Sequence, residues 1–346
     1  MKIKIVEREL HIQMKNLENL GEFNIINLLQ TYIDSSDLIG RNEDAYLYSN
    51  HHPYILVNVD TMTRNSDFLP QQTWKQLGVK LVAITFSDLA AKGATPNLFI
   101  SSLVLEETMK EGELKELVAA IQKTSHTYGA KYLGGDLGSS VETVLTGVGV
   151  GAIESGKILT RRDAKRKDLI CVTGYFGLTS IGLDYLLSPE TRNYEVIPDN
   201  LIDIGISSLH EPQPRLREGV LLSKHNLATS SIDSSDGLAI SLHWLAKASN
   251  IGIIIYDLPI HPELKSSFDS FDTILEMTMF GGEEYELIFT VPPSNLGKVE
   301  QVFTENNCKF FVIGECTDSQ GVFVSHNESL IPIPMRGWDT FRRKIS

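Results

Sequence analysis

The chain has 346 residues, of which 42% are hydrophobic and 22% charged, a composition typical of globular proteins that excludes a disordered or fibrous chain. Acidic residues outnumber basic ones by 44 to 31, so we expect no nucleic-acid partner, because such binding depends on clustered lysine and arginine. No apolar run approaches the roughly 20 residues of a membrane span, and the N-terminal residues lack a signal-peptide core. The three cysteines form no CxxC pair, which favours reduced thiols. We therefore expect a cytoplasmic protein that does not enter the membrane.

Helical and strand periodicities alternate along the first half of the chain. Apolar residues at helical spacing predict a helix over 22–33, and a buried strand is expected at 54–60. A long helix follows from Gln72 to Lys92, where Gly93 ends it. We expect a strand at 99–105, a helix over 111–128, a short strand at 131–133 and a strand at 141–153. The last of these contains the sequence Gly147-Val-Gly149-Val-Gly151, which we interpret as close packing rather than as a dinucleotide site, because no helix follows at once.

The second half repeats this mixture after a basic loop at 161–167. Strands are expected at 169–173, 252–256 and 284–291, and helices at 180–187 and 237–249. A polar connection spans 189–200, and we expect the C-terminal quarter to alternate short strands and turns. The pattern predicts a mixed α/β (α+β) fold with two layered α/β sandwich domains, at 1–156 and 157–346.

Aspartates gather where strands are expected to end, which is where ligand sites form in α/β domains. Asp60 ends a strand, Asp136 follows Gly134-Gly135, and Asp233 and Asp236 lie between a strand and a helix, while Asp44 precedes a short strand-like segment. Some of these acids have a simpler explanation when taken alone. A role for Asp233 or Ser235 as the cap of the following helix is as well supported as a ligand role, and the Gly-Gly-Asp sequence is typical of a tight turn.

Asp88 differs because it lies within a predicted helix, on the same face as Leu77, Leu81 and Ile84. A carboxylate on such a face is costly to bury unless it is protonated, hydrogen-bonded or paired with a cation. If several of these acids converge, two charges about 4 Å apart repel by roughly 4 kcal/mol at an effective dielectric constant near 20. Either some acids are protonated or a divalent cation such as Mg²⁺ neutralises them, and Mg²⁺ commonly shares its ligands with phosphates. The acids thus predict a phosphate site with several Mg²⁺ ions.

Four motifs together resemble those of the thiamine-monophosphate kinase family, which belongs to the aminoimidazole-ribonucleotide-synthetase-like superfamily. The motifs are Ser87-Asp-Leu-Ala-Ala-Lys-Gly-Ala94, Gly134-Gly-Asp136, Asp233-Ser-Ser-Asp-Gly-Leu238 and Gly281-Gly-Glu-Glu-Tyr-Glu-Leu287. The resemblance extends from residue 20 to residue 341. It implies a homodimer whose N-terminal domains join their sheets, with ATP bound near that interface. It also implies direct, Mg²⁺-dependent transfer of the γ-phosphoryl group of ATP to thiamine monophosphate, which gives thiamine diphosphate.

The resemblance also assigns roles to individual residues. The implied metal ligands are Asp44, Asn58, Asp60, Asp88, Asp136, Asp233 and Asp236, of which Asp136 and Asp236 are also the catalytic residues. The implied ATP contacts are Gly135, Asp136, Arg161 and Ser235, and the implied contacts to the acceptor substrate are Asp67, Glu283 and Trp338. For Arg161 the simpler alternative is a solvated basic loop, and for Trp338 it is a C-terminal core anchor.

The departures from the family pattern fall mainly on the acceptor side. Asp67 stands where the family has a histidine, Asn58 and Val59 replace two threonines, and Leu137-Gly138-Ser139 replaces Thr-Thr-Arg. Two alternatives therefore stay open beside the kinase. One is a related ATP-dependent enzyme with a different small phosphorylated acceptor, and the other is a nucleotide-binding homologue that has lost catalysis.

Overall fold

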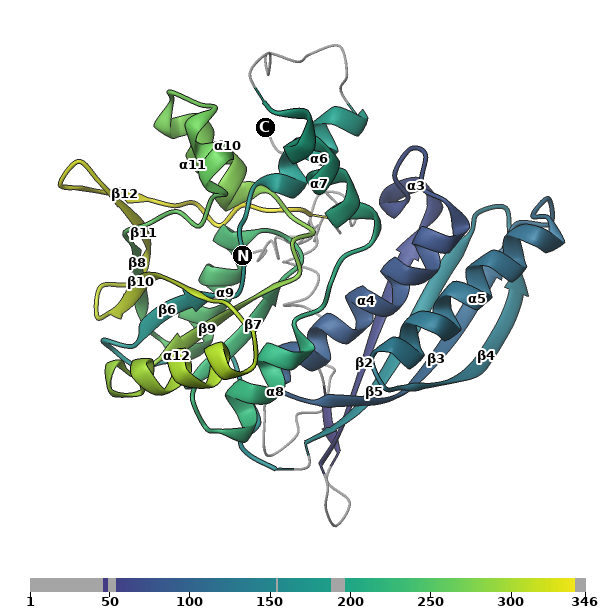
Figure 1. Cartoon of the computed structure of the whole chain (residues 1–346), viewed down its shortest axis with the longest axis horizontal. Coiled ribbons are helices and arrows are strands. Elements are labelled where there is room, and N and C mark those ends of the chain that lie inside the picture. Colours follow the sequence, from purple (N-terminus) through teal and green to yellow (C-terminus); the bar gives the residue numbers. More distant parts are fainter. Residues whose placement is uncertain (1–45, 49–53, 154, 188–196, 340–346) are drawn as a thin grey trace, which may run out of the picture. The chain divides into compact units, whose positions relative to one another are not determined.

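The computed structural model describes residues 46–48, 54–153, 155–187 and 197–339, and the account below concerns the compact unit Ser35–Trp338. The helix expected over 22–33 and the predicted ligand Asp44 lie outside the described residues. Within them, two separate β-sheets are accompanied by helices (Figure 1), which confirms the mixed α/β class. No helix in the described ranges is long and apolar enough to cross a membrane.

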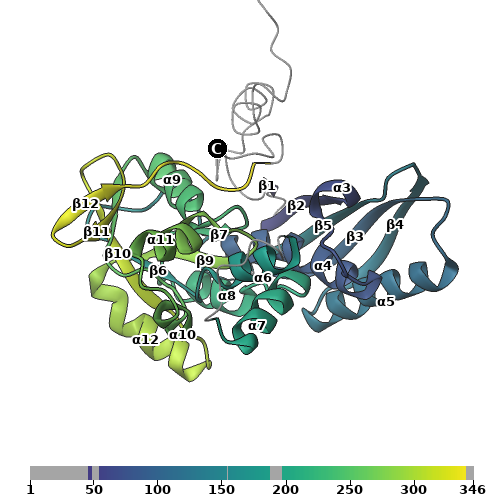
Figure 2. The ribbon, with the colours of Figure 1, turned by 90° about the horizontal axis from the view of Figure 1, so that it is seen from above.

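The first sheet has five strands in the order β1-β2-β5-β3-β4. Its strands are β1 (Tyr46–Tyr48), β2 (Tyr54–Thr63), β5 (Val144–Ile153), β3 (Thr95–Leu105) and β4 (Lys131–Ser139). Helices α4 (Trp74–Lys92) and α5 (Glu111–Thr127) lie on one face of the sheet (Figure 2), and the short helix α3 (Arg64–Asp67) follows β2. Burial alternates along β5, as a sheet with one covered face requires.

The second sheet has seven strands in the order β12-β11-β8-β10-β6-β9-β7. These are β12 (Ser329–Pro332), β11 (Gly321–His326), β8 (Gly252–Ile255), β10 (Phe311–Thr317), β6 (Leu169–Val172), β9 (Glu286–Val291) and β7 (Ser230–Ser234). Its accompanying helices are α6 (Leu178–Leu187), α7 (Asp199–His210), α8 (Leu216–Lys224), α9 (Leu238–Ser249), α10 (Pro262–Ser266), α11 (Phe271–Phe280) and α12 (Leu296–Glu305). Every residue of β7 and β9 is buried, because α4 and α9 pack against β7 at this end of the sheet.

Helix α4 packs against both sheets and is therefore the element that connects the predicted site residues. It begins at a capping box in which Thr73 and Gln76 bond each other's backbone N–H groups, and it ends at Gly93, whose φ of 75° suits a glycine. Buried residues occupy every side of the helix, and it contacts β2, β5, β7 and α8. A helix that is apolar all round is one enclosed by its neighbours. The expected helix over 72–92 is thereby confirmed, with its start two residues later.

The glycines of β5 allow α4 to approach the first sheet closely. A Cβ atom on Gly147 would lie 2.5 Å from the Thr85 hydroxyl, and one on Gly149 would lie 3.0 Å from Thr85 Cγ2. The first distance is shorter than real side chains show and the second is tighter than most, so glycine suits both positions under the helix. The interpretation of these glycines as close packing is confirmed.

Two expectations about local structure are wrong. Gly134 and Gly135 form no tight turn but continue β4 as far as Ser139, and Gly135 is required because a Cβ there would lie 1.7 Å from the Ser101 carbonyl oxygen. The C-terminal quarter holds α11 and α12 in addition to strands and turns. Both helices bury an apolar stripe at helical spacing, such as Val299, Val302 and Phe303, within a segment whose turns and prolines dominated the sequence pattern.

Candidate active site

Three predicted acids meet where α4 passes between β2 and β7. Asp60 lies on β2, Asp88 on α4, and Asp233 on β7. The Asn58 side-chain amide donates to Asp60 Oδ2 and to Asp88 Oδ2, both at 3.1 Å, and to the Thr85 carbonyl oxygen at 2.7 Å. The structure thus brings together residues that are up to 173 positions apart in the sequence.

We call Asp60, Asp88 and Asp233 the acid cluster. Burial and like charge make ionisation of its carboxyl groups unfavourable. Burial, and then the negative charge of Asp233, raise the pKa of Asp60 from 3.8 to about 7. Burial and the charges of Asp60 and Asp233 also raise the pKa of Asp88, against the opposing charge of Lys92. Like charges in a poorly solvated place disfavour ionisation of one another. The cluster therefore either keeps protons at neutral pH or takes up cations.

Two further oxygen atoms lie beside the cluster. Asn58 Oδ1 is buried and has no hydrogen-bond partner among the described residues, and the Ser87 hydroxyl donates to Asp233 Oδ2 at 2.8 Å. In the ranges the structure describes, no three His, Cys, Asp or Glu side chains form a ready-made metal site, and the Asn58 amide bridges Asp60 and Asp88. Carboxylates plus an unsatisfied amide oxygen are a donor set that suits Mg²⁺ rather than a thiophilic metal.

The Asp233 segment also continues into the predicted acceptor side. The backbone N–H of Glu283 donates to the Ser235 carbonyl oxygen at 2.6 Å, and that of Trp338 donates to the Asp236 carbonyl oxygen at 3.0 Å. Neither Asp233 nor Ser235 caps α9, since the N-cap position is Gly237 and no side-chain cap bond is made. The helix-cap alternative for these two residues is therefore wrong. Asp236, Ser235, Glu283 and Trp338 instead lie together.

Two residues in this region were not predicted from the sequence. Lys80 of α4 donates from Nζ to both carboxylate oxygens of Glu283, at 2.7 and 2.8 Å. Tyr285 is buried, and burial together with nearby acids, Glu283 first, raises its pKa well above the usual value, so its hydroxyl stays protonated. A signal for Lys80 was present, because it precedes Asp88 by eight residues and so shares its helix face.

The sheet register separates Asp136 from the acid cluster. Pairing runs from Asp60 through β5 and β3 to Gly135, so Asp136, one residue later, points to the opposite face of the sheet. Both Gly135 and Asp136 line a cavity of about 650 Å³ between α5 and the edge of the sheet. Its walls are largely apolar, with Leu103, Leu114 and Val118 among the lining residues.

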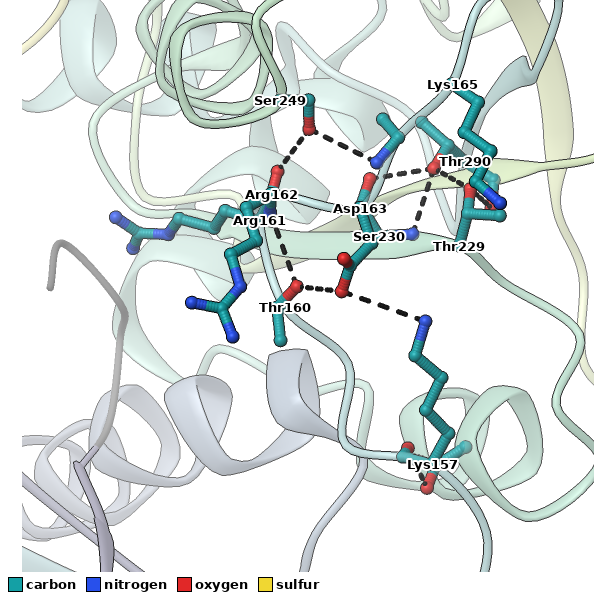
Figure 3. A network of polar contacts seen from close by, with 12 residues as sticks. Lys157, Thr160, Arg161, Arg162, Asp163, Lys165, Thr229, Ser230, Ser249 and Thr290 are labelled. Carbon is teal, nitrogen blue, oxygen red and sulfur yellow. Dashed lines mark hydrogen bonds and ion pairs between the residues drawn. The ribbon is translucent and has the colours of Figure 1, made fainter. Parts of the chain in front are cut away.

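The basic loop is anchored to the fold rather than loose in solvent. The Ser249 hydroxyl donates to the Arg161 carbonyl oxygen at 2.7 Å, and the Thr160 hydroxyl donates to Asp163 at 2.6 Å. Figure 3 shows the side chains of Arg161 and Arg162 pointing away from these hydroxyl and carboxylate groups. The backbone is thus fixed while the two guanidinium groups extend from it.

Asp67 has local partners at the end of α3. Its Oδ2 accepts from the backbone N–H of Thr63 at 2.6 Å and from the Ser66 hydroxyl at 3.1 Å. The carboxylate therefore closes the turn that follows β2. Its predicted contact with the acceptor substrate stays a prediction.

Comparison with known proteins places the chain in a family. The model for the N-terminal domain of AIR synthase related proteins matches residues 42–153, and that for their C-terminal domain matches 185–327. The chain is 30% identical over 314 residues to the thiamine-monophosphate kinase of Pyrococcus horikoshii, which covers 90% of this chain and 94% of that protein. It is 31% identical over 336 residues to that of Bacillus subtilis (93% of this chain and 100% of the relative).

A solved structure shares the fold. AaThiL in complex with AMPPCP and TMP superposes with a TM-score of 0.79 at 24% identity, covering 95% of this chain and 99% of AaThiL. The sequence relatives and the two matched domain models carry the assignment, and the structural likeness agrees with it. The chain therefore belongs to the thiamine-monophosphate kinase family.

Proposed function

We propose that the protein transfers the γ-phosphoryl group of ATP to thiamine monophosphate and so forms thiamine diphosphate. A phosphate oxygen of the acceptor forms a bond to the γ-phosphorus, the bond from that phosphorus to the β–γ bridging oxygen breaks, and ADP leaves. The relatives carry the name of this activity, and the AaThiL structure contains AMPPCP, an ATP analogue, together with TMP. The observation in this chain that carries the proposal is the acid cluster with Asp236 and Glu283 beside it.

Mg²⁺ is the proposed cofactor because the cluster combines shifted acids with an unsatisfied amide oxygen. Bound there, it would neutralise the acids and the charge of the phosphates, which is most of what phosphoryl transfer requires. The residues that would hold it are Asn58, Asp60, Asp88, Asp233 and Asp236. Asp136 points to the opposite face of the sheet and Asp44 lies outside the described residues, so the metal role of these two stays a prediction.

The proposed ATP contacts come from three different parts of the fold. Gly135 and Asp136 line the cavity beside α5, whose apolar walls suit a planar base. Arg161 extends from an anchored loop, where a guanidinium group suits a phosphate. Ser235, next to Asp236, is the fourth contact. On the acceptor side, Glu283 offers a carboxylate, and Trp338, 43% exposed, offers an aromatic face to a cationic ring.

A homodimer is proposed from the face of the first sheet that α4 and α5 leave uncovered. Val59 is 59% exposed there, and its register neighbours Val148 and Ile100 share that face. Helices α4 and α5 lie against the other face of this sheet (Figure 2). A second copy of the chain is the proposed occupant, since exposed apolar side chains on a sheet face favour association. Light scattering should give twice the chain mass, and Val59→Asp should give monomers.

The domain division at 1–156 and 157–346 is likewise a proposal, supported by the separation into two sheets. So is a cytoplasmic location, supported by the thiols, since Cys171, Cys308 and Cys316 form no disulfide.

One observation favours a second candidate, a related enzyme with a different phosphorylated acceptor. Asp67 replaces the histidine of the family pattern, and its carboxylate is occupied by Thr63 and Ser66. Purified protein mixed with ATP, Mg²⁺ and thiamine monophosphate tests both candidates. Thiamine diphosphate formed at the rate of ADP release supports the kinase. ADP release only with other phosphorylated acceptors supports the second candidate, and nucleotide binding without turnover of any acceptor indicates an inactive homologue.

A further inference from the structure

Lys80 forms an ion pair that the proposed reaction does not yet use. Its side chain is 1% exposed, whereas that of Glu283, its partner, is 32% exposed. Nζ reaches both carboxylate oxygens, at 2.7 and 2.8 Å. The pair joins residues 203 positions apart and links α4 to the loop between α11 and β9. A buried ammonium group is therefore directed at a carboxylate that faces the site.

The environment of the pair fixes the carboxylate from two directions. Glu283 has a φ of 63°, a left-handed conformation that is unfavourable for a residue with a side chain. The backbone N–H of Glu283 donates to the Ser235 carbonyl oxygen at 2.6 Å, and the backbone N–H of Tyr285 donates to the Ser234 carbonyl oxygen at 2.8 Å. The loop is thus fastened to the Asp233–Asp236 segment, and the side chain is fastened to α4.

Burying the ammonium group is costly, and packing does not require it. Position 80 is surrounded by buried apolar residues of α4, where an aliphatic side chain of similar length would avoid the desolvation cost of a charge. The side chain of Glu283 is about one third exposed, so water partly solvates its carboxylate even without an ion pair. Lys80 instead fixes the orientation of the Glu283 carboxylate, because two short hydrogen bonds from one Nζ hold the carboxylate plane. The lone pairs that point away from Lys80 remain available to a ligand.

We propose that Lys80 is a positioning residue for acceptor recognition, which rests on the proposed function. It holds Glu283 as an oriented hydrogen-bond acceptor for N–H groups of the acceptor's heterocycle, such as a ring amino group. Lys80 balances the charge of Glu283. Recognition of the acceptor by Glu283 therefore depends more on the direction of the hydrogen bond than on net charge. Lys80 and Asp88 lie eight residues apart on one helix, about 12 Å along its axis, so α4 also sets the spacing between the acceptor contact and the acid cluster.

Steady-state kinetics of Lys80→Met test this role. The KM for thiamine monophosphate should rise about tenfold or more, the effect of losing a well-directed hydrogen bond to a charged group, while the KM for ATP stays within about twofold. In a Glu283→Gln background, Lys80→Met should add almost nothing, because it acts through Glu283. The double variant also removes the unpaired carboxylate, so it supplies the comparison if Lys80→Met alone does not fold.

Arg215→Met is the matched control. Arg215 forms the neighbouring ion pair with Glu286 of β9, at 2.7 Å from Nε, and that strand follows the same loop. This variant should lower the melting temperature without a selective rise in the KM for thiamine monophosphate.

Three results would overturn the role of Lys80: equal shifts in both KM values, a full additional loss from Lys80→Met when Glu283 is already glutamine, or no change in the KM for thiamine monophosphate. If the wild type forms thiamine diphosphate but Lys80→Met leaves the KM for thiamine monophosphate unchanged, only the role of Lys80 is refuted. A wild type that forms no thiamine diphosphate refutes the proposed function and this role with it.

Discussion

Glu284 offers a quantitative test of the electrostatics beside the site. Its Oε1 accepts from the Thr179 hydroxyl at 3.0 Å, and its buried Oε2 has no hydrogen-bond partner among the described residues. Burial is the main reason that its pKa rises from 4.5 to about 7. Unlike Glu283 and Glu286, which have Lys80 and Arg215, Glu284 has no ion pair within the described part of the chain. We expect it to be protonated in the folded protein under mildly acidic conditions.

The sign and size of the effect follow from the two pKa values. Below about pH 4.5 the carboxyl group is protonated in both states and burial carries no ionic cost. Between pH 4.5 and 7 the unfolded chain ionises first, so the free energy of unfolding falls as the pH rises, and it levels off above pH 7. A shift from 4.5 to about 7 corresponds to about 3 kcal/mol, given about 1.4 kcal/mol for each pH unit.

The perturbation is Glu284→Gln, which keeps the size of the side chain and an oxygen for Thr179 but does not ionise. Urea unfolding of both proteins, followed by circular dichroism from pH 4 to pH 8, gives the difference between their unfolding free energies. That difference should move by about 3 kcal/mol in favour of the variant across this range, because contributions from distant groups cancel on subtraction.

Glu300→Gln is the matched control, because Glu300 is exposed on α12, and its difference curve should be flat. Parallel stability curves for wild type and Glu284→Gln would refute the argument that burial governs Glu284. A difference moving in the opposite direction would mean that the carboxylate is stabilised in the folded state.

Three further predictions concern the acid cluster and the residues beside it. Asp236→Asn should lower kcat roughly 10²- to 10³-fold with an unchanged circular dichroism spectrum, since its charge acts on the transferred group; wild-type turnover would contradict this. Without divalent ions, Asp88→Asn should raise the melting temperature, because one of three mutually repelling carboxylates is removed, and Mg²⁺ should stabilise this variant less than wild type in the same thermal scan. Gly149→Ala should cost about 1–3 kcal/mol in urea unfolding and blunt the Mg²⁺ response, because its Cβ would lie 2.6 Å from Asn58 Oδ1; an unaltered response would place the ion away from Asn58.

Local patterns were sufficient to predict the elements that carry the site. The alternation in β5, the long apolar helix ending at Gly93, and the position of Asp88 on its buried face all follow from side-chain periodicity. The prediction that acids would converge held for Asp60, Asp88 and Asp233, and the repulsion contributes to the raised pKa values of Asp60 and Asp88.

The contacts that give the site its shape depend on pairing between distant segments. Residue types and spacing did not distinguish Asp60 from Asp136, which the strand register sends to opposite faces of one sheet. Nor did they reveal that Gly135 must pass under the Ser101 carbonyl oxygen, or that Lys80 meets Glu283.

The chain by itself thus determined which segments form helices and strands and which side chains carry charge, because each segment's periodicity reflects its own burial. The tertiary structure alone decided which charges face one another. Register and helix packing are set by the whole set of long-range contacts, and a shift of a single residue along a strand turns a carboxylate to the other side.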